Sequence, residues 1–280
     1  MNASDRVETD RRRLTLVLGE MESAVIAFSG GVDSTLVVRA AADTPRLRFV
    51  ALTTRSYTNT AEEVDEAVRL AREIGAEHLV VDVDELATPG YAENPAHRCY
   101  LCKETLYPEC ESIARERGFA FVADGVNTDD LGDYRPGLRA AAERGVRHPL
   151  VEAGLTKSAV RELSRFYGLP TADRPASPCL SSRFPYGTAI TREGLARVAA
   201  AEAVLRRLGF VELRVRSLGT TARVEVSARE LERLRDERVR GEARLGIAAA
   251  GFEEVLFSDT ALRSGSLNDV LAKTSPASTS

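Results

Sequence analysis

Residues 25–38 read VIAFSGGVDSTLVV, and this stretch predicts the fold of the chain. An apolar run ends in a small, polar, glycine-rich turn, and a second apolar run follows, as in a strand, a tight loop and a helix. Gly30 and Gly31 allow a sharp turn and leave room for a ligand. The first N–H groups of the helix and its dipole attract an anion, and the hydroxyls of Ser29 and Ser34 add donors. The stretch therefore predicts a loop that binds phosphate or pyrophosphate.

The string SGGVDS at 29–34 resembles the signature loop of the N-type ATP pyrophosphatases, which cut ATP between its α and β phosphates and adenylate a substrate. It does not match a Walker loop, because no Gly-Lys-Ser/Thr follows. Two glycines alone would fit an ordinary strand-to-helix connection, but the whole string in this context favours a phosphate site. The resemblance implies that Asp33 helps to hold Mg²⁺ beside the pyrophosphate.

Size and charge narrow the class of protein. The chain has 280 residues, 44% of them hydrophobic, which allows one large domain or a large and a small one. A net charge of −4 disfavours nucleic acid as a partner. The N-terminus shows no signal peptide, and no apolar run is long enough to span a membrane. We therefore expect a cytoplasmic protein with reduced cysteines and no membrane partner.

Strands and helices alternate in the first 175 residues, which predicts an α/β fold with a doubly wound parallel sheet. Strands are expected near 24–28, 47–53, 78–83 and 119–124, and helices near 5–22, 34–42, 61–74, 103–117 and 156–167. Ligands of such sheets bind beyond the carboxyl ends of the strands, where the loops 29–34, 53–56 and 124–130 fall. The expected ATP contacts are Ser29, Gly30, Gly31, Asp33, Ser34, Thr53 and Ser56.

The pattern changes after a Pro- and Ser-rich stretch. A helix at 192–208, strands at 211–217 and 222–226, and two short helices between 228 and 250, followed by the stretch EEVLF at 253–257, predict a small α+β domain. The expected organisation is an ATP pyrophosphatase domain at 1–175, a linker at 176–190, a substrate-binding domain at 191–272 and a disordered tail at 273–280.

Lys157 lies in the first turn of a predicted helix, against the helix dipole. Either its ammonium group is solvated or an anion lies near it. The stretch LTKSAVR at 155–161 resembles the second, lysine-bearing motif of ATP pyrophosphatases, and this resemblance implies that Lys157 meets the phosphates.

Four cysteines raise the question of a metal. Cys110 shares a helical face with apolar residues and reads as part of the core. Cys99 and Cys102 form a Cys-x-x-Cys pair just before the helix predicted at 103–117, and Cys179 lies in the linker. The pair could be incidental, and Cys179 could be a buried apolar contact. Three cysteines outside the core also suit an iron–sulfur cluster with one open iron, or zinc with a fourth ligand.

Four stretches resemble the ATP-dependent sulfur transferase (LarE) family, which matures the nickel-pincer nucleotide cofactor of lactate racemase. They are RCYLCK at 98–103, PCLSSRFPYGTAIT at 178–191, RVR at 214–216 and LRSGSLN at 262–268. With the loop at 29–34, the match covers nearly the whole chain. The resemblance implies that ATP adenylates a carboxylate of a pyridinium dicarboxylate mononucleotide, which then becomes a thiocarboxylate.

The resemblance also implies roles for residues outside the ATP loop. In some members the cysteine at position 179 is the sulfur donor and is converted to dehydroalanine. Others carry the pattern of Cys99, Cys102 and Cys179, as this chain does, and hold a [4Fe–4S] cluster that relays sulfide. We expect the cluster, with sacrifice of Cys179 as the alternative. The substrate phosphate is expected at Arg214, Arg216 and Arg263, with Glu202 as a further site residue; a solvated outer face is the other reading of the strand arginines.

Three rival functions fit parts of this pattern. A tRNA thiolase joins the same ATP loop to cysteines but needs a basic RNA-binding face, and an ammonia-using synthetase would not need the three cysteines. An ATP-binding regulatory module with structural zinc would not release pyrophosphate. We also expect a homo-oligomer and a partner system that supplies sulfide.

Overall fold

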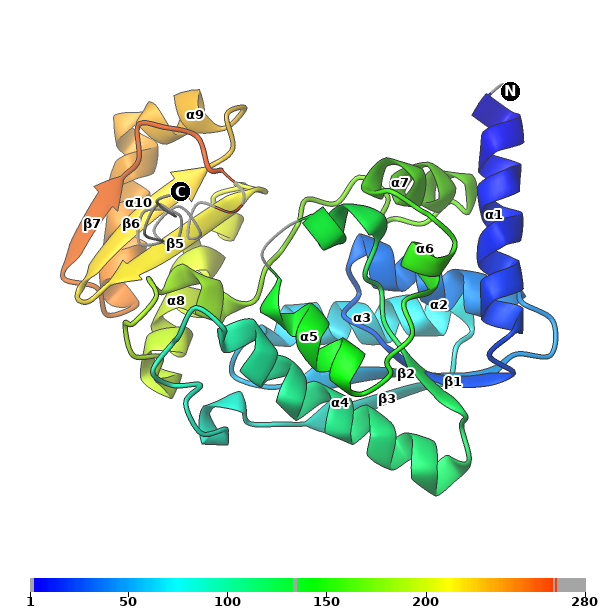
Figure 1. Ribbon diagram of the computed structural model, residues 1–280. Helices are drawn as coiled ribbons and strands as arrows, with labels where there is room; N and C mark the ends of the chain where they lie inside the picture. The colour runs from blue at the N-terminus through cyan, green and yellow to red at the C-terminus, as the bar shows by residue number, and fades with distance from the viewer. Residues whose placement is uncertain (1–2, 133–134, 264, 266–280) are drawn as a thin grey trace, which may run out of the picture. The chain divides into compact units, whose positions relative to one another are not determined.

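The computed structural model describes residues 3–132, 135–263 and 265, and its contacts divide the chain into two compact units (Figure 1). The first unit comprises Met1–Glu85 and Cys99–Ser177, and the second comprises Leu86–Arg98 and Pro178–Ser280. The second unit thus includes residues 86–98, which the sequence assigned to the first domain, and residues 178–190, which it assigned to the linker. The predicted tail at 273–280 lies outside the described residues.

The first unit is built on a parallel sheet with the strand order β3-β2-β1-β4. Its strands are β1 (Ser23–Ala27), β2 (Arg48–Arg55), β3 (His78–Asp82) and β4 (Phe121–Ala123). In the central strand, Val25 pairs with Val50 on one side and Val122 on the other. All five residues of β1 are buried, as expected of a strand covered on both faces.

Helices cover both faces of this sheet, which confirms the predicted doubly wound α/β fold (Figure 1). One face packs against α1 (Ala3–Gly19), α2 (Val32–Asp43), α3 (Ala61–Ile74) and α7 (Lys157–Phe166), and the other against α4 (Arg98–Arg117) and α5 (Pro136–Glu143). Ile26 belongs to the first core and Val25 to the second, because successive side chains of a strand point to opposite faces. The short helix α6 (Pro149–Glu152) precedes α7.

Local signals explain where α3 begins and ends. Thr60 and Glu63 form a reciprocal capping box at its start, and Gly75 ends it in the left-handed conformation with φ +79°. The start of α4 differs from the prediction. The helix begins at Arg98 and not at residue 103, so Cys99 and Cys102 lie in its first turns and not before it. No Gly or Pro lies between Arg98 and Pro108, so nothing in the local sequence prevents the helix from including the Cys-x-x-Cys pair.

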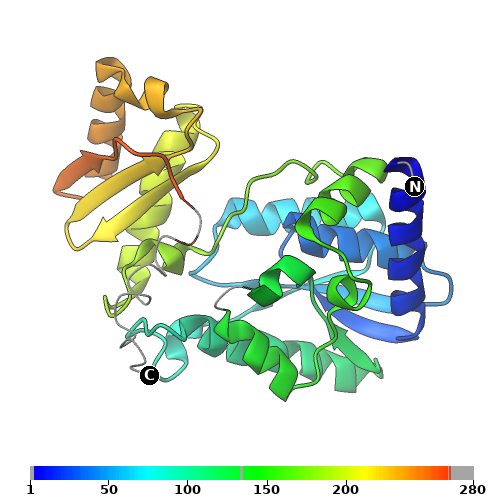
Figure 2. The same cartoon turned by 45° about the horizontal axis from the view of Figure 1, so that its top comes forward.

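The second unit contains a three-stranded sheet with the order β5-β6-β7. The strands are β5 (Leu213–Leu218), β6 (Thr221–Val226) and β7 (Glu254–Phe257), and the helices are α8 (Arg192–Arg207), α9 (Leu231–Arg235) and α10 (Glu237–Ala249). β5 and β6 are antiparallel, and β6 and β7 are parallel. Figure 2 shows α8 and α10 alongside the sheet, and the two helices contact each other. This is the predicted small α+β fold.

Three 3₁₀ helices complete the described structure: η1 (Glu85–Ala87), η2 (Thr128–Gly132) and η3 (Leu180–Arg183). Among the described residues, none of the helices combines the length and the apolar character that a membrane crossing requires.

Candidate functional site

The predicted phosphate loop lies at the carboxyl end of β1, where α2 begins. Gly30 has φ +69°, and a β-carbon there would lie 3.3 Å from Ala67 of α3, so a larger residue would be both strained and crowded. The hydroxyl of Ser29 accepts from Gly31 N at 3.3 Å and lies 3.2 Å from the hydroxyl of Ser34. Ser34 in turn bonds the carbonyl of Gly31. These bonds hold the turn in shape at the N-terminus of α2, where an anion is favoured.

Asp33 and Lys157, predicted separately, meet beside this loop. Lys157 Nζ lies 2.5 Å from Asp33 Oδ2, and Asn127 Nδ2 donates to Asp33 Oδ1 at 3.1 Å. Lys157 begins α7, and its backbone N–H is capped by Asp129 at 3.1 Å. A lysine and a carboxylate at the start of α2 suit a site that receives phosphate together with a divalent cation.

Behind the loop, Gly125 packs against the start of α2. A β-carbon on Gly125 would lie 2.7 Å from the backbone nitrogen of Ser34, so only glycine fits there without displacing the loop. The next residue upstream, Asp124, is buried and holds two partners: Tyr107 donates to it at 2.8 Å, and His148 Nδ1 lies 2.7 Å from it.

The contacts of Asp124 and His148 shift the pKa values of both side chains. Burial acts to raise the pKa of Asp124, but the hydrogen bond to His148 and the charge of Lys103 outweigh it and lower the pKa. Burial acts to lower the pKa of His148, but its bond to Asp124 and the charges of Asp124 and Glu152 outweigh burial and raise the pKa. The pair is therefore an ion pair in mildly acidic solution.

The hydroxyls of Thr53 and Ser56 bond to neighbouring protein groups. Thr53 donates to the carbonyl of Phe28 at 2.6 Å and lies 2.8 Å from His78 Nε2, so the histidine donates to Thr53. Burial lowers the pKa of His78, which keeps the ring neutral. Ser56 donates to the buried carboxylate of Glu85 at 3.0 Å. Both residues lie at the predicted edge of the sheet. Their hydrogen bonds connect the end of β2 to Phe28, which follows β1, and to Glu85, which follows β3.

Arg174 lies at the phosphate loop, although no motif or periodicity in the sequence marks it as a site residue. Its Nη1 donates to the carbonyl of Gly30 at 3.4 Å, and its Nη2 forms an ion pair with Glu66 of α3. Hydrogen bonds from Arg69 and Arg174 lower the pKa of Glu66 to about 2. Arg161 of α7 donates to the backbone carbonyl of Arg174 at 3.0 Å. This bond fixes the segment after α7 beside the phosphate loop.

The three candidate metal ligands fall in different units. Cys99 and Cys102 begin α4 in the first unit, where Cys99 is exposed and Cys102 half-buried, and Cys179 is half-buried in the second. Cys110 is buried in the core, which raises its pKa to about 12, as its predicted packing role requires. All four are thiols, the donor type that iron prefers. No group of three or more metal-ligating side chains is assembled among the described residues.

In the second unit, Arg183 anchors the segment that carries Cys179. Its guanidinium donates to the carbonyl of Pro178 at 2.8 Å and forms a buried ion pair with Glu202 of α8 at 2.7 Å. The carboxylate of Glu202, which is fully buried, also accepts from the backbone N–H of Val215 at 3.0 Å. Glu202 thus links α8, the open edge of β5 and the Cys179 segment.

Arg214 and Arg216 are buried, which excludes the reading of a solvated outer face. Arg216 is fully engaged: it pairs with Glu225 at 2.9 Å and donates to the carbonyl of Ser182 at 2.8 Å. Arg214, 6% exposed, makes no hydrogen bond or ion pair with any residue that the structure describes. Burial, together with the charges of Arg216 and Arg183, lowers its pKa to about 10. A buried, unpaired guanidinium is suited to an anion supplied by a ligand.

Arg263, the third predicted phosphate ligand, lies on the exposed segment that follows β7. Leu262 N donates to the carbonyl of Val226 at 2.8 Å, and Val226 pairs with Leu213. The register thus brings the segment to the end of the sheet where β5 begins, at Leu213, next to Arg214. Ser264 and residues 266–268 of the same motif lie outside the described part of the chain.

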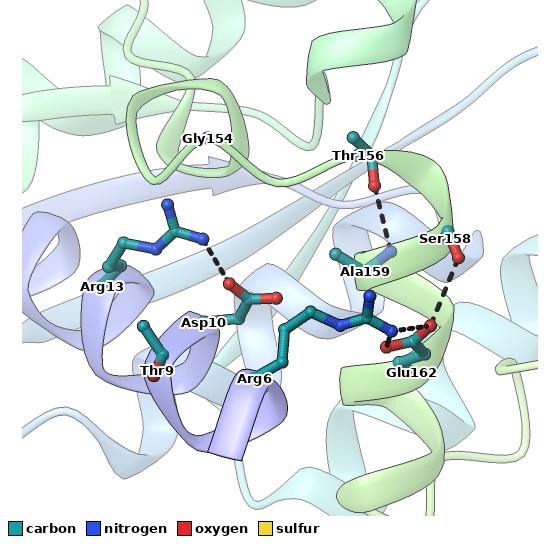
Figure 3. A pocket seen from close by; sticks show the side chains of 9 residues that line it. All are labelled: Arg6, Thr9, Asp10, Arg13, Gly154, Thr156, Ser158, Ala159 and Glu162. Atoms are coloured by element: carbon teal, nitrogen blue, oxygen red, sulfur yellow. Dashed lines mark hydrogen bonds and ion pairs between the residues drawn. The ribbon is translucent and has the colours of Figure 1, made fainter. Parts of the chain in front are cut away.

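A cavity of about 390 Å³ opens between α1 and α7 in the first unit (Figure 3). Its two arginines are paired within its wall, Arg6 with Glu162 and Arg13 with Asp10. None of the nine residues shown is a predicted site residue. We therefore assign this cavity no part in the chemistry.

Comparisons with known proteins show which families this chain resembles. The family profile "Queuosine biosynthesis protein QueC" matches residues 23–96, which include the phosphate loop. An uncharacterised protein of Synechocystis sp. is 44% identical over 95% of this chain and 100% of its own length. The pyridinium-3,5-bisthiocarboxylic acid mononucleotide synthase of Lactiplantibacillus plantarum is 37% identical over 95% of this chain and 96% of its own. A tRNA-specific 2-thiouridylase of Xanthobacter autotrophicus is 28% identical over 55% of this chain and 49% of its own.

Proposed function

Because this chain belongs to the pyridinium-3,5-bisthiocarboxylic acid mononucleotide synthase (LarE) family and is an ATP-dependent sulfur transferase, we propose that it converts a carboxylate of a pyridinium dicarboxylate mononucleotide to a thiocarboxylate. The product would serve the nickel-pincer cofactor of lactate racemase. The observation that carries the proposal is Arg214, a buried guanidinium without a partner among the described residues, which suits the phosphate of a mononucleotide.

The first step needs ATP because a carboxylate is a poor electrophile, with no good leaving group. Transfer of AMP to the carboxylate releases pyrophosphate and supplies AMP as the leaving group. We assign the pyrophosphate to the loop at Ser29–Ser34, with Asp33 holding Mg²⁺ and Lys157 turning from Asp33 to the phosphates. The pair between them neutralises both side chains until the nucleotide and its metal arrive.

The second step needs a sulfur nucleophile at the acyl carbon. We propose that Cys99, Cys102 and Cys179 hold a [4Fe–4S] cluster, which when bound would supply transferable sulfide at its open iron. The three accessible or half-buried thiols support this assignment by their chemistry. The alternative uses Cys179 alone. Its thiolate would displace AMP to form a thioester, and β-elimination would then leave the thiocarboxylate and dehydroalanine.

Anaerobic reconstitution with iron and sulfide tests the sulfur source. A broad visible absorption that is lost in Cys99→Ser, Cys102→Ser and Cys179→Ser, but kept in the control Cys110→Ser, would support the cluster. Full single-turnover activity of the Cys99→Ser/Cys102→Ser protein, with dehydroalanine at position 179 by mass spectrometry, would establish the sacrificial route. Pyrophosphate release should depend on the pyridinium mononucleotide, and release that depends on tRNA instead would refute the proposed substrate.

A further inference from the structure

We propose that Arg98 is a positioning residue for sulfur transfer, and that it acts by holding the backbone of the segment that carries Cys179. The inference deepens the proposed function and rests on it for the step that is affected. Arg98 belongs to residues 86–98, which pack in the second unit although they precede α4 along the chain. Its side chain is 3% exposed.

Arg98 binds the Cys179 segment directly. Its Nη1 donates to the carbonyl of Ser181 at 3.0 Å and also bonds Asn94 Oδ1, and its guanidinium lies 5.8 Å from the ring of Tyr186. These contacts join it to η3, which follows Cys179, and to Tyr186, three residues beyond the end of η3. A planar guanidinium with several donors can bridge such acceptors at once, whereas an ammonium group cannot match its geometry.

The neighbours of Arg98 bind the same segment. Asn94 is fully buried, and its amide donates to the carbonyls of Phe184 at 3.3 Å and Pro185 at 2.7 Å. Its own carbonyl accepts from Gly187 N at 2.9 Å. The hydroxyl of Tyr91 lies 2.8 Å from the hydroxyl of Ser181. The stretch 91–98 therefore follows the Cys179 segment along its length.

Arg98 differs from Arg183 and Arg216, which also bond this segment, because no carboxylate of the described residues forms an ion pair with it. Arg183 is paired with Glu202, and Arg216 with Glu225. The partners of Arg98 are neutral, and it forms no ion pair within the part of the chain that the structure describes. A buried cation without a counter-ion is unfavourable, so packing alone would be served better by an apolar side chain. We infer that an arginine stands at this position because its guanidinium holds the carbonyl of Ser181 in place.

The position of Arg98 in the sequence also places it next to one of the three candidate cluster ligands. It is the first residue of α4, and Cys99 follows it directly. The bond from Arg98 to Ser181 therefore lies within the second unit, one residue along the chain from Cys99. Both routes for sulfur transfer require that the segment that carries Cys179 stays ordered around its thiol.

Alkylation of Cys179 by iodoacetamide tests the inference without reference to catalysis. In the full chain, peptide-resolved mass spectrometry follows Cys179, with buried Cys110 as the internal reference. Arg98→Gln should raise the rate at Cys179 by about tenfold, which corresponds to about 1.4 kcal/mol. Arg98→Lys should raise it less. The control Arg233→Gln, which also removes bonds to backbone carbonyls of the second unit, should leave it unchanged.

A second measurement is the thiocarboxylate formed per pyrophosphate released, which should also fall about tenfold in Arg98→Gln. If that variant does not fold, Tyr91→Phe, which removes only one hydroxyl near Ser181, should raise the alkylation rate of Cys179 by about threefold. An unchanged rate in the folded variant, or an equal rise in Arg233→Gln, would overturn the inference. Failure of wild-type protein to release pyrophosphate with the pyridinium substrate would refute the proposed function alone, and the alkylation rates would still decide the role of Arg98.

Discussion

Replacing Arg214 with methionine should make the protein more stable and weaken its binding of substrate. The reason is that Arg214 carries a buried positive charge, which forms no ion pair with any of the described residues. Burial and then the charges of Arg216 and Arg183 outweigh the opposing charges of Glu225 and Glu202 and lower its pKa by two to three units, to about 10. Since each pKa unit is worth 1.36 kcal/mol, keeping Arg214 charged costs about 3 kcal/mol of folding free energy at neutral pH.

Methionine fills a similar elongated volume without the charge, so Arg214→Met should raise the free energy of unfolding by about 1–3 kcal/mol. Loss of the charge-assisted bonds to the phosphate should weaken substrate binding by about 1.5–3 kcal/mol. The matched variant is Arg216→Met. It removes the buried one of the two arginine partners of Glu225, which keeps Arg223 at 3.3 Å, and the donor to Ser182, so it should lower stability by about 1.5–3 kcal/mol.

Urea denaturation followed by circular dichroism gives the stability of each variant, and isothermal titration calorimetry gives its affinity. The ligands are the pyridinium dicarboxylate mononucleotide and the corresponding nucleoside without phosphate. Arg214→Met should lose affinity for the mononucleotide and bind the nucleoside as wild type does. A loss of stability in Arg214→Met would contradict the cost assigned to its buried charge. An equal loss of affinity for both ligands would show that the guanidinium does not receive the phosphate.

Three further predictions concern substitutions in the first unit. Asp33→Asn should abolish pyrophosphate release while circular dichroism shows an unchanged fold, and formation of ADP and phosphate by wild type would refute the loop assignment. His148→Asn should flatten the pH dependence of Tm: because the folded pKa of His148 is raised above 6.5, its stabilisation is complete below pH 6.5 and is lost as the pH rises through the folded pKa. A Tm profile unchanged by His148→Asn would contradict this assignment. Gly125→Ala should weaken ATP binding by at least about tenfold, because its β-carbon would meet the phosphate loop. Gly132→Ala has open space and should bind ATP normally, and equal binding by both variants would contradict the close approach.

Local sequence patterns determined most elements of the fold. The strand, glycine turn and helix at 25–38 were predictable because apolar periodicity and glycine act within a few residues. The same holds for α3, whose capping residues and terminal glycine mark both ends. The parallel sheet followed from the alternation of strands and helices. The expected ligands of ATP, substrate and metal came from motif resemblance, and their binding roles stay predictions.

Tertiary structure decided which of these side chains have partners. Alternation along β5 placed Arg214 and Arg216 on one face, but only packing showed that Arg216 is paired and Arg214 is not. The bond of Asp33 to Lys157 joins residues 124 positions apart. Likewise, Arg98 reads from sequence as the neighbour of a Cys-x-x-Cys pair, whereas the fold buries it against Ser181. Such contacts depend on where distant segments pack, and the periodicity of a single segment carries no information about its partner.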